Sequence, residues 1–191
     1  HFNNMKTIVA VIVALTYTFA TVAAETCQNE LQKQNLDTQR FFKGDWYVTL
    51  IKDVKGDALC HLYKTKIEGG LIKLTADGDY KFKGLTKKYS TTCNTTTLNP
   101  TGPFILKCMH TNDKENIPFD LKLSVVETEY DYFALVYRCT TYGDQSLNMN
   151  SGNYVILTRN TINNDYVAED NQANSTDDEW SAKRFTKTVG C

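Results

Sequence analysis

Six cysteines are the residues of this sequence with the clearest chemical meaning. An even number of cysteines in an exported chain favours disulfide bonds, although it leaves the connectivity open. Zinc binding is the alternative, but no two cysteines have the C-x-x-C spacing, and only His61 and His110 follow the N-terminal apolar segment. We therefore expect three disulfides and no metal site among Cys27, Cys60, Cys93, Cys108, Cys139 and Cys191.

Motifs that mark common catalytic sites are missing from the sequence. It has no G-x-S-x-G nucleophile elbow, no glycine-rich phosphate loop and no H-E-x-x-H motif. The cysteines are assigned to disulfides, and an isolated histidine near a strand is more often held by ordinary hydrogen bonds than used as a base. We predict that the protein is not an enzyme.

Residues 1–24 have the three parts of a secretory signal peptide. Met5-Lys6 is the basic start, residues 7–15 are an apolar run, and small residues lead to a cleavage site after Ala24. The apolar run is shorter than the roughly 20 residues that span a bilayer. We predict a secreted protein that begins at Glu25 and does not associate with membranes.

Composition indicates one ordinary globular domain over residues 25–191. The 21 Lys and Arg residues nearly balance the 22 Asp and Glu residues, which excludes a nucleic-acid-binding domain held by phosphate contacts. Apolar residues make up 41% of the chain, enough for a core of normal size. We expect a monomer, with N-glycosylation sequons at Asn94 and Asn174 that agree with export.

Most of the sequence after residue 45 consists of short strand-like runs separated by turn residues. This pattern predicts an all-β barrel or sandwich, and the short connections predict that neighbouring strands are antiparallel. These strands would position any binding site. A capping box at Thr176–Glu179, followed by Trp180–Phe185, predicts a C-terminal helix, and a short turn is expected near Leu36–Phe42. The expected strands are Trp46–Lys52, Leu59–Lys66, Leu71–Thr75, Asp79–Cys93 with a bend, Phe104–His110, Phe119–Thr128, Tyr132–Thr140 and Tyr154–Arg159.

Three motifs in order resemble those of the lipocalins. Gly44-Asp45-Trp46 opens the first strand, residues 128–132 (TEYDY) form a turn before a late strand, and Arg159 ends the last strand. The segments 44–49, 132–142 and 152–159 are similar to the triabin, procalin and pallidipin group of salivary lipocalins from blood-feeding insects. The similarity covers essentially the whole mature chain.

This resemblance implies an eight-stranded up-and-down barrel that is open at one end for a small ligand. At the closed end, Arg159 would lie over the indole of Trp46 as a structural contact. No cofactor is implied, because the related haem-carrying nitrophorins use a histidine in the stretch that corresponds to residues 71–82, which has none here. The resemblance also implies the disulfides Cys27–Cys139, Cys60–Cys191 and Cys93–Cys108.

If the two chain ends lie outside the barrel, their partners Cys139 and Cys60 must point outward. Side chains alternate along a strand, so the neighbours of these cysteines point inward. The residues selected as ligand-facing are Leu59, His61 and Tyr63 on one strand, and Ala134, Val136, Arg138 and Thr140 on the other.

Arg138 is the most informative of these residues, because a guanidinium inside a barrel needs an anionic or accepting partner. We predict that it receives a carboxylate or phosphate of the ligand, with Tyr63 or His61 as a second donor. Two alternatives stay open: a strand register wrong by one residue, or an arginine that extends to the barrel mouth with its charge in water. The direction of Lys122 is also undecided.

The function that these features predict is the capture of a small host mediator of haemostasis or inflammation. An eicosanoid, a nucleotide or a biogenic amine would each serve, and its removal would inhibit platelet aggregation or vasoconstriction. An inward Arg138 favours an anion, whereas an amine would need an inward acidic residue, and none lies at the selected positions. A salivary antigen with a degenerate pocket is a third reading.

A protein-binding inhibitor of a coagulation protease or platelet receptor is the alternative from a different class. It would act through exterior loops, and the tripeptide K-G-D occurs at residues 43–45 and 55–57. We expect the first copy to be buried with the G-x-W motif and the second to lie at the open end. Tripeptides of this kind are frequent by chance, so this alternative ranks lower.

Overall fold

The computed structural model describes residues 27–30, 32–54, 58–82, 84–95, 102–143, 151–161 and 184–190. The predicted signal peptide, the second K-G-D tripeptide, Asn174 and Cys191 lie outside these residues. No helix in the described part of the chain is long and apolar enough to cross a membrane.

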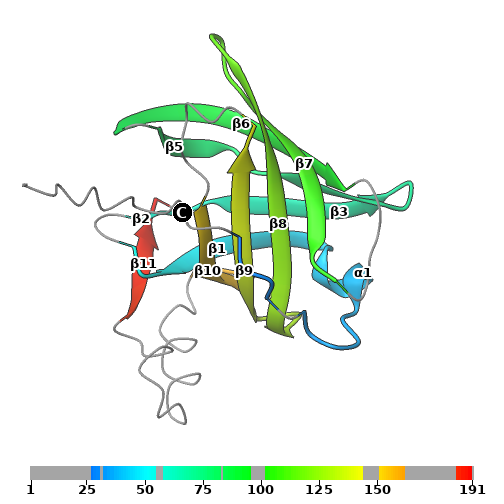
Figure 1. Cartoon of the computed structure of the whole chain (residues 1–191). Coiled ribbons are helices and arrows are strands. Elements are labelled where there is room, and N and C mark those ends of the chain that lie inside the picture. Colours follow the sequence, from blue (N-terminus) through cyan, green and yellow to red (C-terminus); the bar gives the residue numbers. More distant parts are fainter. Residues whose placement is uncertain are drawn as a thin grey trace, which may run out of the picture.

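The described strands form the predicted all-β, lipocalin-like barrel (Figure 1). Eight antiparallel strands follow one another around the ring, and pairing of the last with the first closes it. In ring order they are β1 (Gly44–Lys52), β3 (Leu62–Glu68), β4 (Leu71–Thr75), β6 (Leu85–Thr95), β7 (Phe104–Thr111), β8 (Asn116–Glu129), β9 (Phe133–Tyr142) and β10 (Ser151–Thr158).

Burial alternates along these strands as their sequence pattern predicts. In the second half of β6 and throughout β7, side chains are buried and exposed in turn, which places every second residue inside the barrel. The interior apolar side chains of all eight strands join one core cluster, whose fully buried members include Trp46, Ile72, Leu106 and Val125.

The run expected as one bent strand over residues 79–93 is instead a hairpin. β5 (Gly78–Phe82) pairs antiparallel with the first part of β6, and Phe82 lies opposite Leu85 in this pairing. Gly84 in the turn has a φ of +80°, which a residue with a side chain rarely adopts. The chain therefore reverses where the sequence pattern alone had indicated a bend.

The predicted C-terminal helix is not seen. Residues 176–183 lie outside the described part of the chain, and Phe185 already belongs to β11 (Phe185–Val189). β11 pairs with β1 and, in parallel, with the two-residue strand β2 (Ala58–Leu59) on the outside of the barrel (Figure 1).

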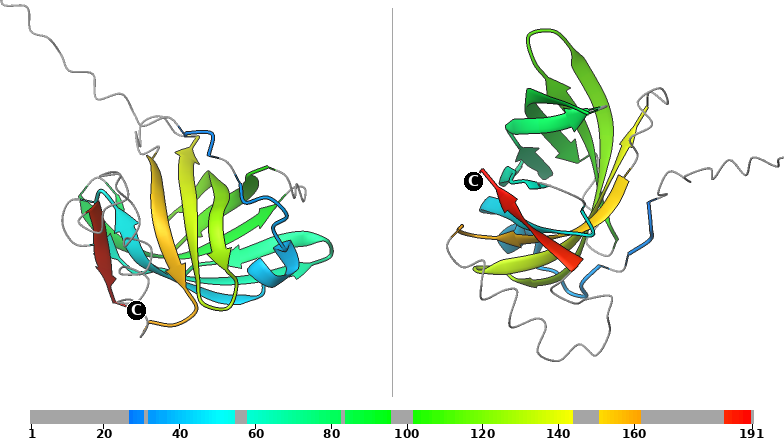
Figure 2. Two further views of the ribbon diagram at one scale, coloured as in Figure 1. Left: turned by 90° about the horizontal axis from the view of Figure 1, so that it is seen from below. Right: turned by 90° about the vertical axis from the view of Figure 1, so that its left-hand side faces the viewer.

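Two of the three disulfides implied by the resemblance are present, Cys27–Cys139 and Cys93–Cys108. Cys60 is also disulfide-bonded, and its expected partner Cys191 lies outside the described residues. The Cys27–Cys139 bond ties the N-terminal segment to the outer face of β9, as the blue segment in Figure 2 shows.

The N-terminal segment also settles the direction of Lys122. Its ammonium group donates hydrogen bonds to the carbonyl oxygen of Gln28 (3.0 Å) and to Oδ1 of Asn29 (2.7 Å). Lys122 therefore points outward, while Phe119, Leu121 and Leu123 fill the inner face of β8.

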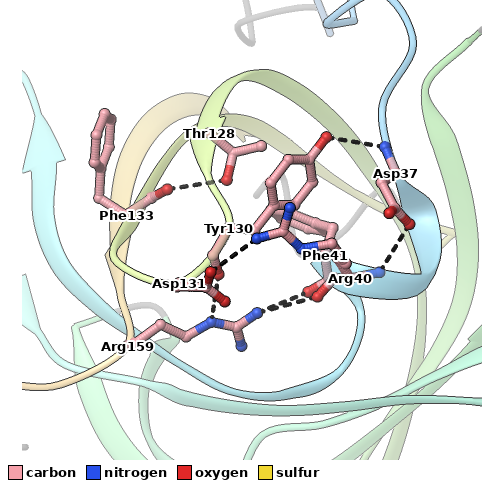
Figure 3. A network of polar contacts seen from close by, with 8 residues as sticks. All are labelled: Asp37, Arg40, Phe41, Thr128, Tyr130, Asp131, Phe133 and Arg159. Carbon is pink, nitrogen blue, oxygen red and sulfur yellow. Dashed lines mark hydrogen bonds and ion pairs between the residues drawn. The ribbon is translucent and has the colours of Figure 1, made fainter.

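At the closed end, Arg159 lies over the indole ring of Trp46, with 3.5 Å between Cζ and the ring centroid, as expected. Its guanidinium donates to the carbonyl oxygens of Tyr130 (2.9 Å) and Phe41 (Figure 3). It also donates to the carbonyl oxygen of Asp45 at 2.9 Å. Phe41 ends the short helix α1 (Thr38–Phe41), which falls within the turn expected near residues 36–42.

The first K-G-D tripeptide was expected to be buried, and this expectation was wrong. Lys43, Gly44 and Asp45 are exposed, because β1 emerges at the rim of the closed end and only Trp46 turns inward. The backbone of Gly44 and Asp45 is nevertheless fixed by pairing with β3.

Candidate ligand-binding site

The barrel encloses a cavity of about 400 Å³ at the end opposite Trp46 and Arg159. It lies between the C-terminal ends of β1, β7 and β9 and the N-terminal ends of β3, β8 and β10. Its walls are formed by Ile51, Val54, His61, Tyr63, Leu74, Ala76, Tyr80, Lys81, Thr91, Cys93, His110, Phe119, Leu121, Arg138, Thr140, Tyr142, Ser151, Gly152 and Asn153.

Four of the seven residues selected from the sequence line this cavity: His61, Tyr63, Arg138 and Thr140. Ala134 and Val136 also point inward on β9, but they are buried in the apolar core between the cavity and the closed end.

Leu59 is the exception to the alternation argument. It lines a separate pocket of about 380 Å³ together with Val189 of β11. The reason is that β2 leaves the barrel to pair with β11, so the alternation of β3 does not extend back to Leu59.

Arg138 faces the cavity. Its Nη1 donates a hydrogen bond of 2.7 Å to the hydroxyl of Tyr63 on β3. In the ring of strands, β10 and β1 lie between β9 and β3. Lys81 is the other cationic side chain in the cavity wall, and none of the described lining residues is acidic. The described cavity wall therefore includes cationic side chains and no acidic one.

Aromatic rings stack along one side of the cavity in an order that the sequence did not indicate. His61 stacks on Tyr80 with 4.4 Å between ring centroids, Tyr80 contacts His110 at 4.4 Å, and His110 stacks on Phe119 at 4.2 Å. Tyr80, His110 and Tyr142 were missed as cavity residues. The alternation from Cys108 would have selected His110, had the inward direction of that cysteine been known.

A directed chain of hydrogen bonds runs through these rings. The Tyr80 hydroxyl donates to the carbonyl oxygen of Ala76 (3.1 Å), so it must accept from the Thr91 hydroxyl (3.1 Å). Thr91 then accepts from Nδ1 of His110 at 2.7 Å, which leaves Nε2 of His110 to accept from the Tyr142 hydroxyl at 3.3 Å.

Both histidines of the cavity are neutral at physiological pH. Burial lowers the pKa of His61 to about 4, with a further contribution from the positive charge of Arg138. Burial also lowers the pKa of His110 to about 4, assisted by His61. Burial raises the pKa of Tyr142 to about 12, so its hydroxyl keeps its proton. The rings thus add hydrogen-bonding groups to the cavity without adding charge.

Asn94, the first predicted glycosylation site, is exposed on the outer face of β6, between Lys73 and Lys107 on the neighbouring strands. A glycan there would lie outside the barrel and away from the cavity.

Comparison with known proteins identifies the family. The family model described as Triabin matches residues 19–171, most of the chain. Triafestin-2 of Triatoma infestans is 30% identical over 176 residues, which cover 88% of this chain and 84% of that protein. The chain belongs to the triabin family of salivary lipocalins. Triabin of Meccus pallidipennis is 27% identical over 167 residues, covering 87% of this chain and 99% of triabin.

Solved structures of binding proteins share the fold of this chain. A leukotriene C4 complex of LTBP1 is 26% identical, with a TM-score of 0.52, over 70% of this chain and 77% of that chain. The amine-binding protein of Rhodnius prolixus, in its tryptamine complex, has a TM-score of 0.54 over 71% of each chain; at 16% identity it supports the fold alone. This triabin-family chain is a non-enzymatic binding protein of the lipocalin type.

Proposed function

We propose that this triabin-family protein is secreted in saliva and sequesters a small anionic lipid mediator of host haemostasis or inflammation inside its barrel. Removal of an eicosanoid of this kind would inhibit platelet aggregation or vasoconstriction. Capture of this type is stoichiometric, so it needs only a preformed cavity and no catalytic group.

The observation that carries the proposal is the placement of Arg138 in the cavity wall. Its guanidinium is held by the hydroxyl of Tyr63, and no described acidic side chain of the cavity competes for its charge. A ligand carboxylate is the natural partner for a guanidinium in such a site. Apolar side chains such as Ile51, Leu74 and Leu121 would contact a hydrocarbon chain.

One solved relative and the charge of the cavity wall support an eicosanoid over a biogenic amine. LTBP1, at 26% identity, has been crystallised with leukotriene C4, which is a lipid acid. A biogenic amine would bring a further positive charge into a cavity that Arg138 already faces, with no described acidic lining residue to receive it. A nucleotide is also anionic, so charge alone does not distinguish it from a lipid acid. Native mass spectrometry of the protein with a mixed panel of lipid acids, nucleotides and amines makes that distinction, and we expect the protein to retain the lipid acid.

Replacement of Arg138 by alanine tests the proposal. We expect the affinity for a lipid carboxylate to fall by roughly 1.5 to 3 kcal/mol, or about one to two decades in dissociation constant, because a charge-assisted hydrogen bond is lost. Titration calorimetry measures this change. Lys122→Ala is the matched control, because it removes a cation that points outward. An unchanged affinity in Arg138→Ala, or an equal loss in Lys122→Ala, would contradict the proposal.

The protein-binding alternative rests on the K-G-D tripeptide at residues 55–57, which lies outside the described residues. An inhibitor acting through this loop would block platelet aggregation by every agonist and would lose that effect in Asp57→Ala. A scavenger would block only the agonist that it binds, and excess agonist would overcome the inhibition.

A further inference from the structure

His61 offers the cavity a hydrogen-bond acceptor rather than the donor expected from the sequence. Its Nε2 lies 3.1 Å from the backbone carbonyl oxygen of Asp79. A carbonyl oxygen can only accept, so Nε2 carries the proton of the ring. Since the ring is neutral, Nδ1 is unprotonated and can only accept a hydrogen bond.

The orientation of the ring is fixed by its surroundings. The edge formed by Nε2 and Cδ2 faces β5, where a Cβ atom added at Gly78 would lie only 3.2 Å from Cδ2. One face of the ring stacks on Tyr80, with an interplanar angle of 17°. The opposite edge, which carries Nδ1, is therefore turned away from β5, and the residue lines the cavity.

Donors with unused capacity lie beside this acceptor. Arg138 has five N–H groups and uses one of them on Tyr63. The Tyr63 hydroxyl accepts that bond, so its own O–H remains to be donated into the cavity. Tyr63 and His61 are two residues apart along the chain and both line the cavity, which corresponds to about 7 Å along an extended strand.

We propose that the preferred ligand carries a hydroxyl group near its carboxylate: the carboxylate binds Arg138 and Tyr63, and the hydroxyl donates its proton to Nδ1 of His61. This inference rests on the proposed capture of a lipid acid and adds the chemical feature that distinguishes among such acids. A hydroxyl far along the hydrocarbon chain would lie beyond the reach of His61 once the carboxylate is bound.

Three fatty acids of equal chain length test the inference by titration calorimetry: arachidonate, its 5-hydroxy derivative and its 15-hydroxy derivative. We expect the unmodified protein to bind the 5-hydroxy acid about threefold to tenfold more tightly than the other two, the range for one neutral hydrogen bond. In His61→Phe this preference should disappear, so that the 5-hydroxy acid and arachidonate bind with equal affinity to the variant.

The outcomes separate the two proposals. If none of the three acids binds, the proposed function fails and the inference fails with it. If arachidonate binds but the 5-hydroxy group adds no affinity, or if its preference survives in His61→Phe, the inference is overturned while lipid capture stands. The comparison of the three acids on the unmodified protein decides the matter even if His61→Phe does not fold.

Discussion

At the scale of residues, the cavity combines a guanidinium with two imidazoles that burial keeps neutral. Arg138 would supply the charge for the proposed anionic ligand, and His61 and His110 have hydrogen-bonding groups whose donor and acceptor roles follow from their backbone and hydroxyl partners. Specificity in such a site depends on polar groups that would be left unpaired by the wrong ligand.

The two histidines predict a pH dependence of stability. Each has a pKa of about 4 in the folded protein and near its ordinary value of 6.5 when unfolded. Between these values the unfolded chain binds more protons, so the free energy of unfolding falls as the pH falls from about 6.5 to about 4. We expect a loss of a few kcal/mol across this window.

Urea denaturation at about pH 7.5 and about pH 5 measures this loss, since most carboxylates stay ionised over that range. The loss should be smaller in His61→Phe, which removes one of the two titrating rings. An equal loss in the variant and the parent would assign the effect to other groups.

At the scale of elements, the pairing of β9 with β10 depends on one glycine. Gly152 lies opposite Cys139, and the Tyr137 side chain crosses directly over it on the outer face. A Cβ atom at Gly152 would lie 1.9 Å from the Tyr137 hydroxyl oxygen. That hydroxyl accepts a hydrogen bond from the backbone of Gln28, so the N-terminal segment depends on the same contact.

Gly152→Ala should therefore destabilise the protein by about 1 to 3 kcal/mol, the usual cost of overpacking. Urea denaturation measures this effect. Gly143→Ala is the matched control, because no atom lies within 4 Å of a Cβ added there. Equal stability of the two variants would show that Tyr137 moves aside without cost.

At the scale of the whole molecule, the two ends of the barrel have different tasks. Arg159 joins α1 to the turn between β8 and β9 at the closed end through backbone carbonyls (Figure 3), and it also bonds the carbonyl oxygen of Asp45 on β1. The cavity lies at the other end of β1 and β9. A change at the closed end should affect stability without changing the shape of the cavity.

Arg159→Lys tests this separation. Lysine keeps the charge but cannot hold several carbonyls with a planar fork, so we expect a loss of about 3 kcal/mol in the free energy of unfolding. The affinity for a lipid acid should stay within about twofold of the parent value. A large loss of affinity in a variant that is still folded would show that the two ends are coupled.

The sequence by itself determined the class of fold and the contact at the closed end, and with the disulfides implied by the family resemblance it predicted, without settling, an inward Arg138. These follow from local rules: alternation reports which residues share a face of a strand, and the motifs around Trp46 and Arg159 specify a contact that the structure contains. The structure contains the Cys27–Cys139 bond outside the barrel, and this one long-range link is consistent with the inward direction that alternation predicted for Arg138.

Only the tertiary structure decided which other residues reach the cavity. Leu59 lies outside because β2 pairs with β11, a strand more than a hundred residues later in the chain. Tyr80 lies inside because β5 folds back along β6 as a hairpin, whereas the sequence showed only a bent run. His110 lies inside because it shares a face of β7 with Cys108, whose direction is set by its bond to Cys93 on the neighbouring strand. Alternation groups residues onto one face or the other, but the pairing of distant strands decides which face is the inner one.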